Sequence, residues 1–341
     1  MNTGDEDIDQ FQTDGANPQI GVVVIGRNEG KRLHDCLRSV AGHGVTIVYV
    51  DSGSTDGSVD AARKLGARVV ALDMSEPFTA ARARNAGVDA LLNTSDIDYV
   101  QFVDGDCTVV DGWLDSARTF LDATPRAGVV SGQLREERPD ASLYNRLTDR
   151  EWSTPAGVVD ACGGVAMMRI SAFKDVHGFN VSLIAGEEPE LCVRLRAAGW
   201  QIHCLENAMA MHDINMTSLG QWLRRARRAG HAFAEVSSMH RALPERIWQR
   251  ETLRAVLWTA IAPIALLLAM VFHSLFAVLL LVYPLQALRI AMSDKPLRRD
   301  SIAFGVLMVA QKPFEAMGIL DYWLKRNGQE KNRYEKERGA S

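Results

Sequence analysis

Two aspartates separated by one glycine follow an apolar run rich in β-branched and aromatic residues. The stretch reads Tyr99-Val-Gln-Phe-Val-Asp104-Gly105-Asp106, and the run predicts a buried strand that ends at a surface. In an open α/β sheet, ligands bind beyond the carboxyl ends of the strands. Two carboxylates this close repel each other unless they share a cation, and Mg²⁺ and Mn²⁺ prefer oxygen ligands. The spacing therefore indicates half of a divalent-metal site. A polar turn without a ligand is the alternative that this stretch alone leaves open.

Two other predicted strands also end in polar residues. One is followed by Gly26-Arg27-Asn28-Glu29 and the next by Asp51-Ser52-Gly53-Ser54-Thr55-Asp56-Gly57. An acidic group such as Asp51 at a strand end can accept hydrogen bonds from a base or a ribose, and Thr55 or Asp56 can cap the following helix. A capped turn and nothing more is the alternative here. We expect all three strand ends to open onto one crevice.

Short apolar strands alternate with helical segments from Ile20 onward. The hydrophobic periodicity predicts strands at 20–25, 45–50, 68–72, 99–103 and 128–132, and helices at 30–40, 56–65, 78–92 and 112–122. This alternation predicts right-handed crossovers and an α/β fold whose mainly parallel sheet is covered on both faces. The sequence contains no P-loop and no dinucleotide fingerprint, which argues against those two classes of nucleotide-binding protein.

Five motifs stand in the order and rough spacing of family 2 glycosyltransferases. They are Gly26-Arg-Asn-Glu29, Asp51-Ser-Gly-Ser-Thr-Asp-Gly57, Ala83-Arg84-Asn85-Ala-Gly87, Val103-Asp-Gly-Asp106, and Gly186-Glu187-Glu188 continuing to Arg196 and Trp200. The chain resembles that family from about residue 20 to residue 216, and five ordered motifs are more specific than any one of them. The resemblance implies a Rossmann-like, mainly parallel sheet, the A-type glycosyltransferase fold. Two positions depart from the family pattern, because Asp51 precedes Ser52 where a second aspartate is common, and Glu188 stands where aspartate is commoner.

The resemblance implies roles for individual residues. Asp51 would hold the nucleotide base, Arg84 would lie near the donor phosphates, and Asp106 would be the more direct metal ligand of the Asp-x-Asp motif. The implied donor-binding residues are Arg27, Asn28, Glu29, Asp51, Ser52, Arg84, Asp104, Gly105 and Asp106. The implied metal ligands for Mg²⁺ or Mn²⁺ are Asp104, Asp106 and His212, since some relatives use a histidine at this last place. A core or surface histidine without a metal is the alternative for His212.

The predicted catalytic residues are Glu188, as the base, and Glu187, in a positioning role. A base that takes the proton of the acceptor hydroxyl, on the face opposite the leaving group, gives one displacement and inversion at the anomeric carbon. Stabilisation of a helix start by acidic residues is the alternative for both glutamates. The resemblance also places Gly163 and Gly164 on the acceptor side, where paired glycines allow close approach of a sugar.

The stretch from residue 217 to residue 240 predicts an amphipathic helix with a basic face. An interfacial helix on an anionic leaflet has this pattern, and a solvated basic face packed on the domain is the alternative. The helix begins with Gln221-Trp222-Leu-Arg224-Arg225, which resembles the Gln-x-x-Arg-Trp motif of processive polysaccharide synthases. Arg225 replaces the final tryptophan of that motif. Trp222 and Arg225 are therefore predicted acceptor-binding residues, while processive synthesis is doubtful.

From Ala255 to Ala287 the chain holds no charged residue. Residues 253–272 and 275–292 are just long enough to cross a bilayer as a helical hairpin, and basic residues on both sides place both ends in the cytosol. Residues 301–324 are apolar but interrupted by Gln311, Lys312, Pro313 and Glu315, which favours an in-plane or re-entrant segment. The predicted regions are an acidic disordered tail at 1–18, a catalytic domain at 19–216, an interfacial helix region at 217–250, a membrane region at 251–325 and a charged tail at 326–341.

Together these patterns predict an inverting, metal-dependent glycosyltransferase at the plasma or inner membrane that faces the cytosol. It would move a sugar from a UDP- or GDP-sugar donor to a lipid-linked or glycan acceptor. The N-terminal stretch lacks the basic start and apolar core of a signal peptide. The five cysteines show no metal-ligand spacing. The net charge of −4 gives no reason to expect nucleic acid as a partner.

Two alternatives remain open at this point. A phosphohydrolase of the haloacid dehalogenase type would use Asp104 as its nucleophile, because Asp104-Gly-Asp106-Cys-Thr108 matches the Asp-x-Asp-x-Thr signature of that class. A catalytically silent membrane subunit would bind a nucleotide-sugar without turning it over. This alternative is supported by Glu188, which stands where aspartate is commoner in the family. A turnover assay separates this subunit from an enzyme.

Overall fold

The computed structural model describes residues 20–76, 78–293 and 297–339, with side chains described as far as Arg326. The predicted acidic tail at 1–18 lies outside the described residues. The chain divides into two compact units. The first contains the described residues up to Ala141 together with Thr148–Asn215, and the second contains Ser142–Leu147 and the chain from Met216 onward. The division after Asn215 lies next to the predicted boundary at residue 216.

The first unit contains one nine-stranded sheet with the strand order β3-β2-β1-β4-β8-β6-β9-β5, in which β7 also pairs with β9. Four strands in its first half are mutually parallel: β1 (Ile20–Gly26), β2 (Thr46–Asp51), β3 (Arg68–Ala71) and β4 (Tyr99–Asp104). The second half is mixed and contains β5 (Cys107–Val109), β6 (Ala127–Glu136), β7 (Gly157–Val159), β8 (Ala166–Arg169) and β9 (Gln201–His212). The predicted α/β fold with a mainly parallel sheet is confirmed. The antiparallel pairings in the second half of the sheet were not predicted.

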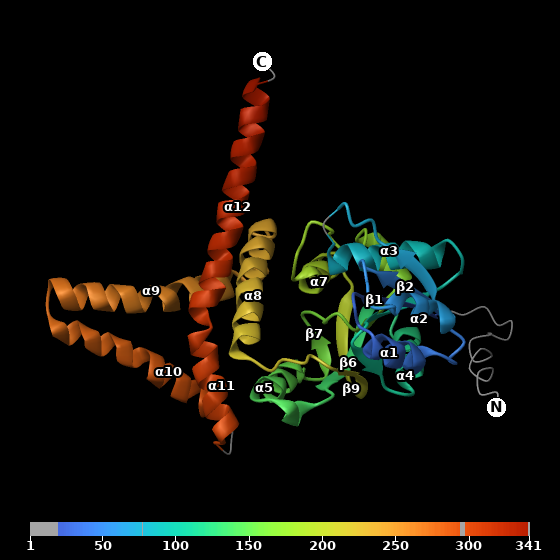
Figure 1. The fold of residues 1–341 in the computed structure, drawn as a ribbon, viewed down its shortest axis with the longest axis horizontal. Coiled ribbons are helices and arrows are strands. Elements are labelled where there is room, and N and C mark those ends of the chain that lie inside the picture. Colours follow the sequence, from blue (N-terminus) through green and yellow to red (C-terminus); the bar gives the residue numbers. More distant parts are fainter. Residues whose placement is uncertain (1–19, 77, 294–296, 340–341) are drawn as a thin grey trace. The chain divides into compact units, whose positions relative to one another are not determined.

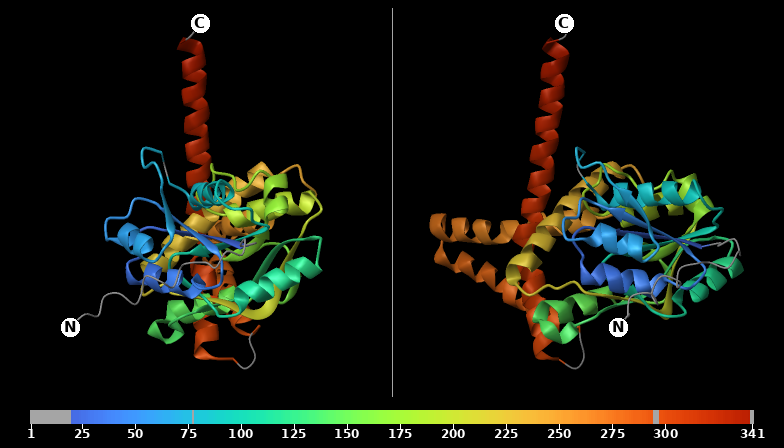
Figure 2. Two further views of the ribbon diagram at one scale, coloured as in Figure 1. Left: turned by 90° about the vertical axis from the view of Figure 1, so that its right-hand side faces the viewer. Right: turned by 45° about the vertical axis from the view of Figure 1, so that its right-hand side comes forward.

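Helices cover both faces of this sheet. Successive side chains of a strand point to opposite faces, so one strand contributes to two cores. Val22 and Val24 share a core with α1 (Lys31–Val40), α2 (Ser58–Lys64) and α4 (Trp113–Ala123). Val23 and Ile25 share the other core with α3 (Ala80–Leu92), α6 (Ile170–Asp175) and α7 (Glu187–Ala197). Figure 2 shows α1 and α3 on opposite sides of the strands. All five cysteines are buried and free of disulfides.

The register of the parallel strands brings the predicted polar segments to one edge of the sheet. Ile25 of β1 lies opposite Asp104 of β4, and Gly26 lies opposite Asp51 of β2. Gly87 lets α3 pack closely on the same strands, since a Cβ at this position would collide with Val23. This close packing places the N-terminal half of α3, and Arg84 with it, beside the strand ends.

The second unit is helical. Helix α5 (Leu143–Trp152) begins in this unit and ends in the first one. It follows a short 3₁₀ turn of the first unit, η2 (Pro139–Ala141). The remaining helices are α8 (Leu219–Met239), α9 (Gln249–Val271), η3 (Ser274–Leu281), α10 (Val282–Ala291), α11 (Arg299–Ala310) and α12 (Lys312–Gly339). Three stretches are long and apolar enough to cross a membrane by length and composition: Gln249–Val271, Ser274–Ala291 and Arg299–Arg326. The first two correspond to the predicted hairpin (Figure 1).

The polar residues that interrupt the third stretch find partners inside the second unit. Gln311 separates α11 from α12 and accepts a hydrogen bond of 2.8 Å from the indole N–H of Trp222. Lys312 and the buried Glu315 form an ion pair at 2.8 Å. Helices α8 and α12 lie side by side (Figure 1) and approach closely at Gly230 and Gly318. Whether this stretch spans the membrane or lies in its plane stays a prediction.

Candidate active site

Arg84 is the centre of a cluster of carboxylates in the first unit. Its Nη2 donates to Asp104 Oδ1 at 2.9 Å and its Nη1 donates to Glu187 Oε1 at 3.2 Å. The same Nη1 lies 2.9 Å from Glu188 Oε1. The Arg84 side chain is 3% exposed, whereas those of Glu188 and Asp104 are 15% and 32% exposed. One buried cation therefore joins the predicted base to the first aspartate of the Asp-x-Asp motif.

Three elements place this cluster. Thr79 caps α3 by accepting a hydrogen bond from the backbone N–H of Arg82 at 3.1 Å, which sets the helix that carries Arg84. Gly186 precedes α7 with a φ of 83°, a conformation that glycine adopts at little cost, and the two glutamates follow in the first turn. Asn85 holds the backbone of Phe179 through two hydrogen bonds, of 2.8 and 2.9 Å. These contacts fix the loop that follows α6 against α3.

Burial raises the pKa of Glu188 to about 7, and the charges of Glu187 and Asp104 act in the same direction, while Arg84 opposes them. Burial would lower the pKa of Arg84, but the charges of Glu188, Asp104 and Glu187 outweigh it and hold that pKa above its ordinary value. Arg84 therefore stays a cation. Glu188 titrates near neutral pH, where a general base is most effective.

Gly164 lies in the middle of the cluster. A Cβ at this position would stand 2.5 Å from Arg84 Nη2, 2.7 Å from Asp104 Oδ2 and 3.2 Å from Glu188 Oε1. The neighbouring Gly163 has open space where its Cβ would be. The absence of a side chain at Gly164 therefore lets these polar groups approach one another.

We expect Gly164→Ala to lower kcat/KM by about 10²-fold, because a methyl group there must push the guanidinium or a carboxylate out of position, and displacements of about 1 Å in an active site have effects of this size. Gly220→Ala is the control and should keep near-normal activity, because Gly220 is exposed on α8 and a Cβ there would come closest to the flexible end of Arg224, at 3.3 Å. Steady-state kinetics of both variants, with circular dichroism to check folding, tests the prediction. Equal activity of the two variants would contradict it.

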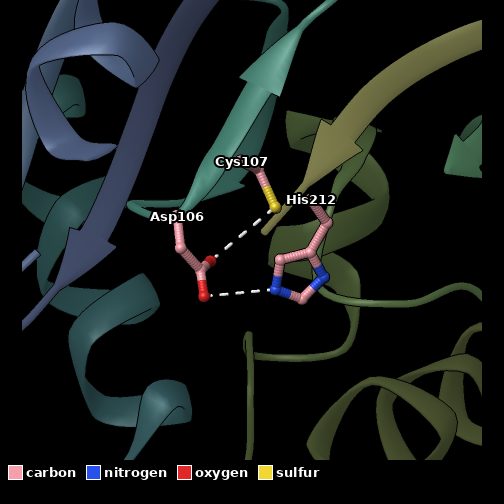
Figure 3. Close-up of side chains that lie close together, drawn as sticks. All are labelled: Asp106, Cys107 and His212. Atoms are coloured by element: carbon pink, nitrogen blue, oxygen red, sulfur yellow. Dashed lines mark hydrogen bonds and ion pairs between the residues drawn. The ribbon is translucent and has the colours of Figure 1, made fainter. Parts of the chain in front are cut away.

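Asp106, Cys107 and His212 form a second cluster (Figure 3). Strand β9 continues past the predicted strand at 201–205 to His212, which lies opposite Cys107 of β5. His212 Nε2 lies 3.1 Å from Asp106 Oδ2, and one potential ligand atom from each of the three residues lies within 4.8 Å of the others. Among the described residues this is the group of histidine, cysteine and acidic side chains that could hold a metal ion.

The donor atoms of this second cluster suit a hard or borderline cation. Burial raises the pKa of Asp106, but the hydrogen bond and charge of His212 outweigh this and keep the pKa below its ordinary value, so the carboxylate is available. Burial and the neighbouring aspartates raise the pKa of Cys107 well above its ordinary value, and a protonated thiol is a poor ligand. A carboxylate with an imidazole fits Mn²⁺ or Mg²⁺. Asp106 and His212 are the residues that would hold it. Asp104, the third predicted ligand, is not in this group and pairs with Arg84.

The His212 ring is held by neighbours that the sequence patterns did not indicate. Trp152 stacks on it with ring centroids 4.6 Å apart and planes at 14°. Its Nδ1 is buried without a hydrogen-bond partner. Burial would lower the pKa of His212, but its hydrogen bond to Asp106 and the charges of Asp106 and Asp104 raise it. Trp152 lies far from His212 along the chain, and no local spacing relates the two.

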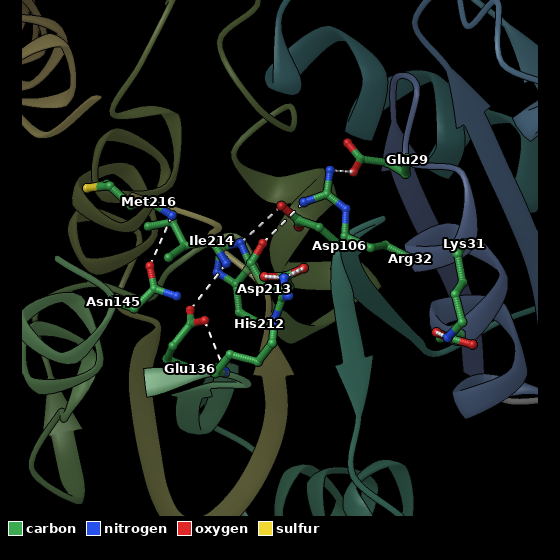
Figure 4. A network of polar contacts seen from close by, with 12 residues as sticks. Glu29, Lys31, Arg32, Asp106, Glu136, Asn145, His212, Asp213, Ile214 and Met216 are labelled. Carbon is green, nitrogen blue, oxygen red and sulfur yellow. Dashed lines mark hydrogen bonds and ion pairs between the residues drawn. The ribbon is translucent and has the colours of Figure 1, made fainter. Parts of the chain in front are cut away.

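The segment that follows His212 is fixed by an ion-pair network (Figure 4). Arg138 donates to both oxygens of the buried Asp213, at 2.7 and 2.6 Å. Glu136 accepts hydrogen bonds from the backbone N–H groups of Arg138 and Ile214, at 3.1 and 3.2 Å. On the other side of Asp106, Arg32 pairs with Glu29 at 2.6 Å. These contacts join the ends of β6 and β9 and keep His212 at the sheet edge.

The predicted donor-binding segments form a connected set of turns. Asp51 Oδ2 accepts from the backbone N–H groups of Gly53 and Ser54, both at 2.9 Å, and Oδ1 accepts from the Tyr49 hydroxyl at 3.0 Å. Asp51 is 4% exposed. Its carboxylate therefore shapes its own turn in this structure, and base binding by Asp51 stays a prediction.

The turn that contains Arg27 and Asn28 contacts the same set. Asn28 Oδ1 accepts from the backbone N–H of Thr55 at 2.7 Å. The Arg27 guanidinium lies 5.4 Å from the centroid of the Phe78 ring. Asp56 accepts from the backbone N–H of Ser58, the first residue of α2, at 3.0 Å. The N-cap of α2 is Gly57, which has no side-chain cap, so the predicted capping by Thr55 or Asp56 is wrong. Ser52 is buried, and its N–H donates to Gly26. Gly105 donates its N–H to Ile25 at 2.8 Å, so the three strand ends are tied together by backbone contacts.

Two predicted acceptor residues, Trp222 and Arg225, belong to the second unit. Trp222 is 2% exposed and packs near Tyr144, with ring centroids 6.1 Å apart. The Arg225 guanidinium lies 5.9 Å from the centroid of the Trp222 ring. In this structure Trp222 is therefore a packing residue of α8, and the acceptor role of both residues stays a prediction.

Two family models match this chain. The family described as Glycosyl transferase family 2 matches residues 21–176, and that described as Glycosyl transferase family group 2 matches residues 99–292. The chain is similar to the pre-mycofactocin glycosyltransferase of Mycobacterium tuberculosis (strain ATCC 25618 / H37Rv), with 30% identity over 234 residues that cover 65% of this chain and 48% of that protein. It is also similar to the succinoglycan biosynthesis protein ExoA of Rhizobium meliloti (strain 1021), with 29% identity over 231 residues that cover 64% of this chain and 67% of that protein.

The chain thus spans about half the length of the first of these curated relatives. Its fold is similar to that of the mannosyltransferase PcManGT from Pyrobaculum calidifontis, which was solved in complex with GDP-Man and Mn²⁺. The TM-score is 0.62 at 19% identity, and the match covers 91% of this chain and 89% of that one. This likeness confirms the fold that the five motifs implied.

Proposed function

The chain belongs to glycosyltransferase family 2, and on that premise we propose that it is an inverting, metal-dependent enzyme of glycan biosynthesis. Its donor is a nucleotide-sugar, UDP- or GDP-linked, and its acceptor is lipid-linked or a membrane-proximal glycan. The observation that carries the proposal is the arrangement of Arg84, Asp104 and Glu188 around the side-chain-free Gly164. A titratable base and a fixed cation meet there at the edge where the strand ends gather.

Glu188 is the proposed base. It takes the proton of the acceptor hydroxyl while that oxygen bonds to the anomeric carbon, and the bond from that carbon to the diphosphate oxygen breaks. A single displacement of this kind inverts the anomeric carbon. Arg84 keeps the Glu188 carboxylate in place at 2.9 Å. Its positive charge also lies where negative charge develops on the leaving diphosphate.

Asp106 and His212, with Asp104, are the proposed ligands of Mg²⁺ or Mn²⁺. Such an ion supplies Lewis-acid stabilisation of the leaving diphosphate when it is bound. Support comes from the 3.1 Å approach of His212 Nε2 to Asp106 Oδ2 and from the Mn²⁺ in the structure of PcManGT. Trp152 and the network around Asp213 are proposed to hold His212 in this position.

The helical unit is proposed to attach the enzyme to the plasma or inner membrane with its catalytic domain on the cytoplasmic side. Helix α9 and the η3–α10 stretch would cross as a hairpin. Residues 301–324 would lie in the plane of the membrane, because α12 packs along α8 and pairs Asp321 with the exposed Arg227 of that amphipathic helix at 2.6 Å. The basic residues on both sides of the hairpin support the orientation.

We expect nucleoside diphosphate to stabilise the protein only when metal is present. A ligand that binds the native state alone raises stability by mass action, by about 2.7 kcal/mol at a hundred times its Kd. UDP or GDP with Mn²⁺ should therefore raise the melting temperature, and the same nucleotide with a chelator should not. Asp106→Ala should abolish the effect, while Asp111→Ala, an exposed aspartate on the same segment, should retain it. Equal stabilisation in chelator would remove the metal role from Asp104 and Asp106.

The family assignment favours a transferase over the phosphohydrolase that Asp104-Gly-Asp106-Cys-Thr108 also matched. In that alternative Asp104 would be a free nucleophile, whereas its Oδ1 accepts a hydrogen bond from Arg84. The same assignment argues against a silent nucleotide-sugar-binding subunit. Release of free nucleoside diphosphate in the presence of an acceptor would exclude it.

A further inference from the structure

A cavity of about 390 Å³ lies between the C-terminal end of α8 and the middle of α12. It belongs entirely to the second unit. Its lining residues are Ser238, Met239, Arg241, Tyr322 and Arg326. The cavity shares no residue with the cluster around Arg84 or with the metal ligands proposed above. It is therefore a separate site that the transfer chemistry does not use.

Hydrogen-bond donors dominate the polar groups of this cavity. Arg326 Nη1 donates to the Ser238 hydroxyl at 2.9 Å and to the Tyr322 hydroxyl at 3.4 Å. The Arg326 guanidinium also lies 5.2 Å from the centroid of the Trp323 ring, so two neighbours on α12 orient it. Arg241 contributes a second, exposed guanidinium. Among the described residues, no acidic side chain lines the cavity.

The cavity lies near the start of the first stretch that is apolar enough to cross a membrane. The stretch Gln249–Val271 begins shortly after Arg241, and Arg326 lies on α12 shortly after the segment 301–324 that we propose to lie in the plane of the membrane. Ala234 of α8, Ala255 of α9 and Ile319 of α12 pack together, and Tyr322 packs against them. The lining residues of α8 and α12 follow directly after this apolar cluster. In a membrane-attached chain, this is where the hydrocarbon layer gives way to headgroups.

We propose that this cavity binds the phosphate group of an anionic lipid headgroup. Guanidinium groups are the preferred partners of phosphate, since their N–H groups match its oxygens in pairs. Basic pockets between helices at the membrane surface bind anionic headgroups. The two hydroxyls add donors, and the cavity volume is within the range of small-molecule sites. Bound lipid would bridge α8 and α12 and so anchor the helical unit to a negatively charged leaflet.

The test uses the full chain purified in a neutral detergent. The probes are dioctanoyl phosphatidic acid, dioctanoyl phosphatidylcholine and inorganic phosphate, and their affinities are measured by native mass spectrometry or titration calorimetry. Phosphatidic acid should bind at least tenfold more tightly than either of the other two. The double variant Arg241→Gln/Arg326→Gln should lose tenfold or more of that affinity.

A matched control removes the same charge elsewhere in the same unit. Arg250 and Arg254 are exposed on the first turns of α9 and do not line the cavity, so Arg250→Gln/Arg254→Gln should bind phosphatidic acid as the unaltered chain does. Equal loss in both double variants would mean general surface attraction and would overturn the proposal. If inorganic phosphate bound as tightly as phosphatidic acid, the ligand would not need to be a lipid, and that part of the proposal would be wrong. If phosphatidylcholine bound as tightly as phosphatidic acid, the site would not require an anionic headgroup, and that part would be wrong. Arg241→Gln alone alters an exposed side chain and keeps the test valid if the double variant misfolds.

Discussion

Glu188→Gln should lower kcat by roughly 10² to 10⁴-fold and leave the KM for the donor nearly unchanged. Glutamine keeps the size of the side chain, but it cannot take the proton of the acceptor hydroxyl. Steady-state kinetics with varied donor and acceptor concentrations measures the change. The unaltered enzyme should also show kcat/KM rising with pH through about 7, the pKa to which burial raises Glu188. Below that pKa the base is protonated, so the rate falls, and Glu188→Gln should lose this dependence.

Two neighbouring glutamates on α7 supply controls for this result. Glu187→Gln should have a milder effect, because Glu187 contacts Arg84 at 3.2 Å and we assign it a positioning role. Glu190→Gln should keep near-normal turnover, since Glu190 is buried and pairs with Arg194 one helical turn away, at 2.7 Å. If Glu188→Gln retained near-normal transfer and melted at a lower temperature, Glu188 would be a structural residue of the helix start. The base would then be sought at Glu187, at the exposed Asp160 or on the substrate.

Arg84→Met should destabilise the protein by about 3 to 5 kcal/mol, the usual cost of removing one partner of a buried ion pair. The Arg84 side chain is 3% exposed and touches three carboxylates, which would be left facing one another without a counter-ion. Methionine fills much of the same space, so the loss of stability measures the removal of the positive charge rather than the creation of a cavity. Chemical denaturation of the full chain in detergent measures it, and transfer activity should also be lost.

Arg63→Met is the comparison for that variant. Arg63 and Asp60 form an ion pair at 3.4 Å whose side chains are 63% and 76% exposed, and exposed pairs contribute only about 0 to 1 kcal/mol. The two variants therefore compare the loss of stability at a buried arginine that contacts three carboxylates with the loss at an exposed arginine–carboxylate pair. A loss below about 1 kcal/mol for Arg84→Met would mean that water, rather than Arg84, keeps the three carboxylates apart.

Local patterns determined the architecture of the first unit. The apolar runs at 20–25, 45–50 and 99–103 became β1, β2 and β4 with small shifts at their ends, because alternation of side chains along a strand depends on residues that are close in sequence. The same runs put Asp51 and Asp104 at the carboxyl ends of adjacent parallel strands. The order of the five motifs also predicted the fold family, and the uncharged run from Ala255 to Ala287 predicted the apolar hairpin.

The contacts within the site were decided by tertiary structure. Arg84 and Glu187 are 103 positions apart, and only the packing of α3 and α7 on the same face of the sheet makes them partners. His212 reaches Asp106 because β9 runs on past the predicted strand and pairs with β5, a short strand with too few residues to show a period. Trp222 lies on α8 and Gln311 between α11 and α12, and they become hydrogen-bond partners only because these helices pack together. Periodicity shows which face of an element is buried. Which side chain another element supplies to that face depends on how the whole chain packs.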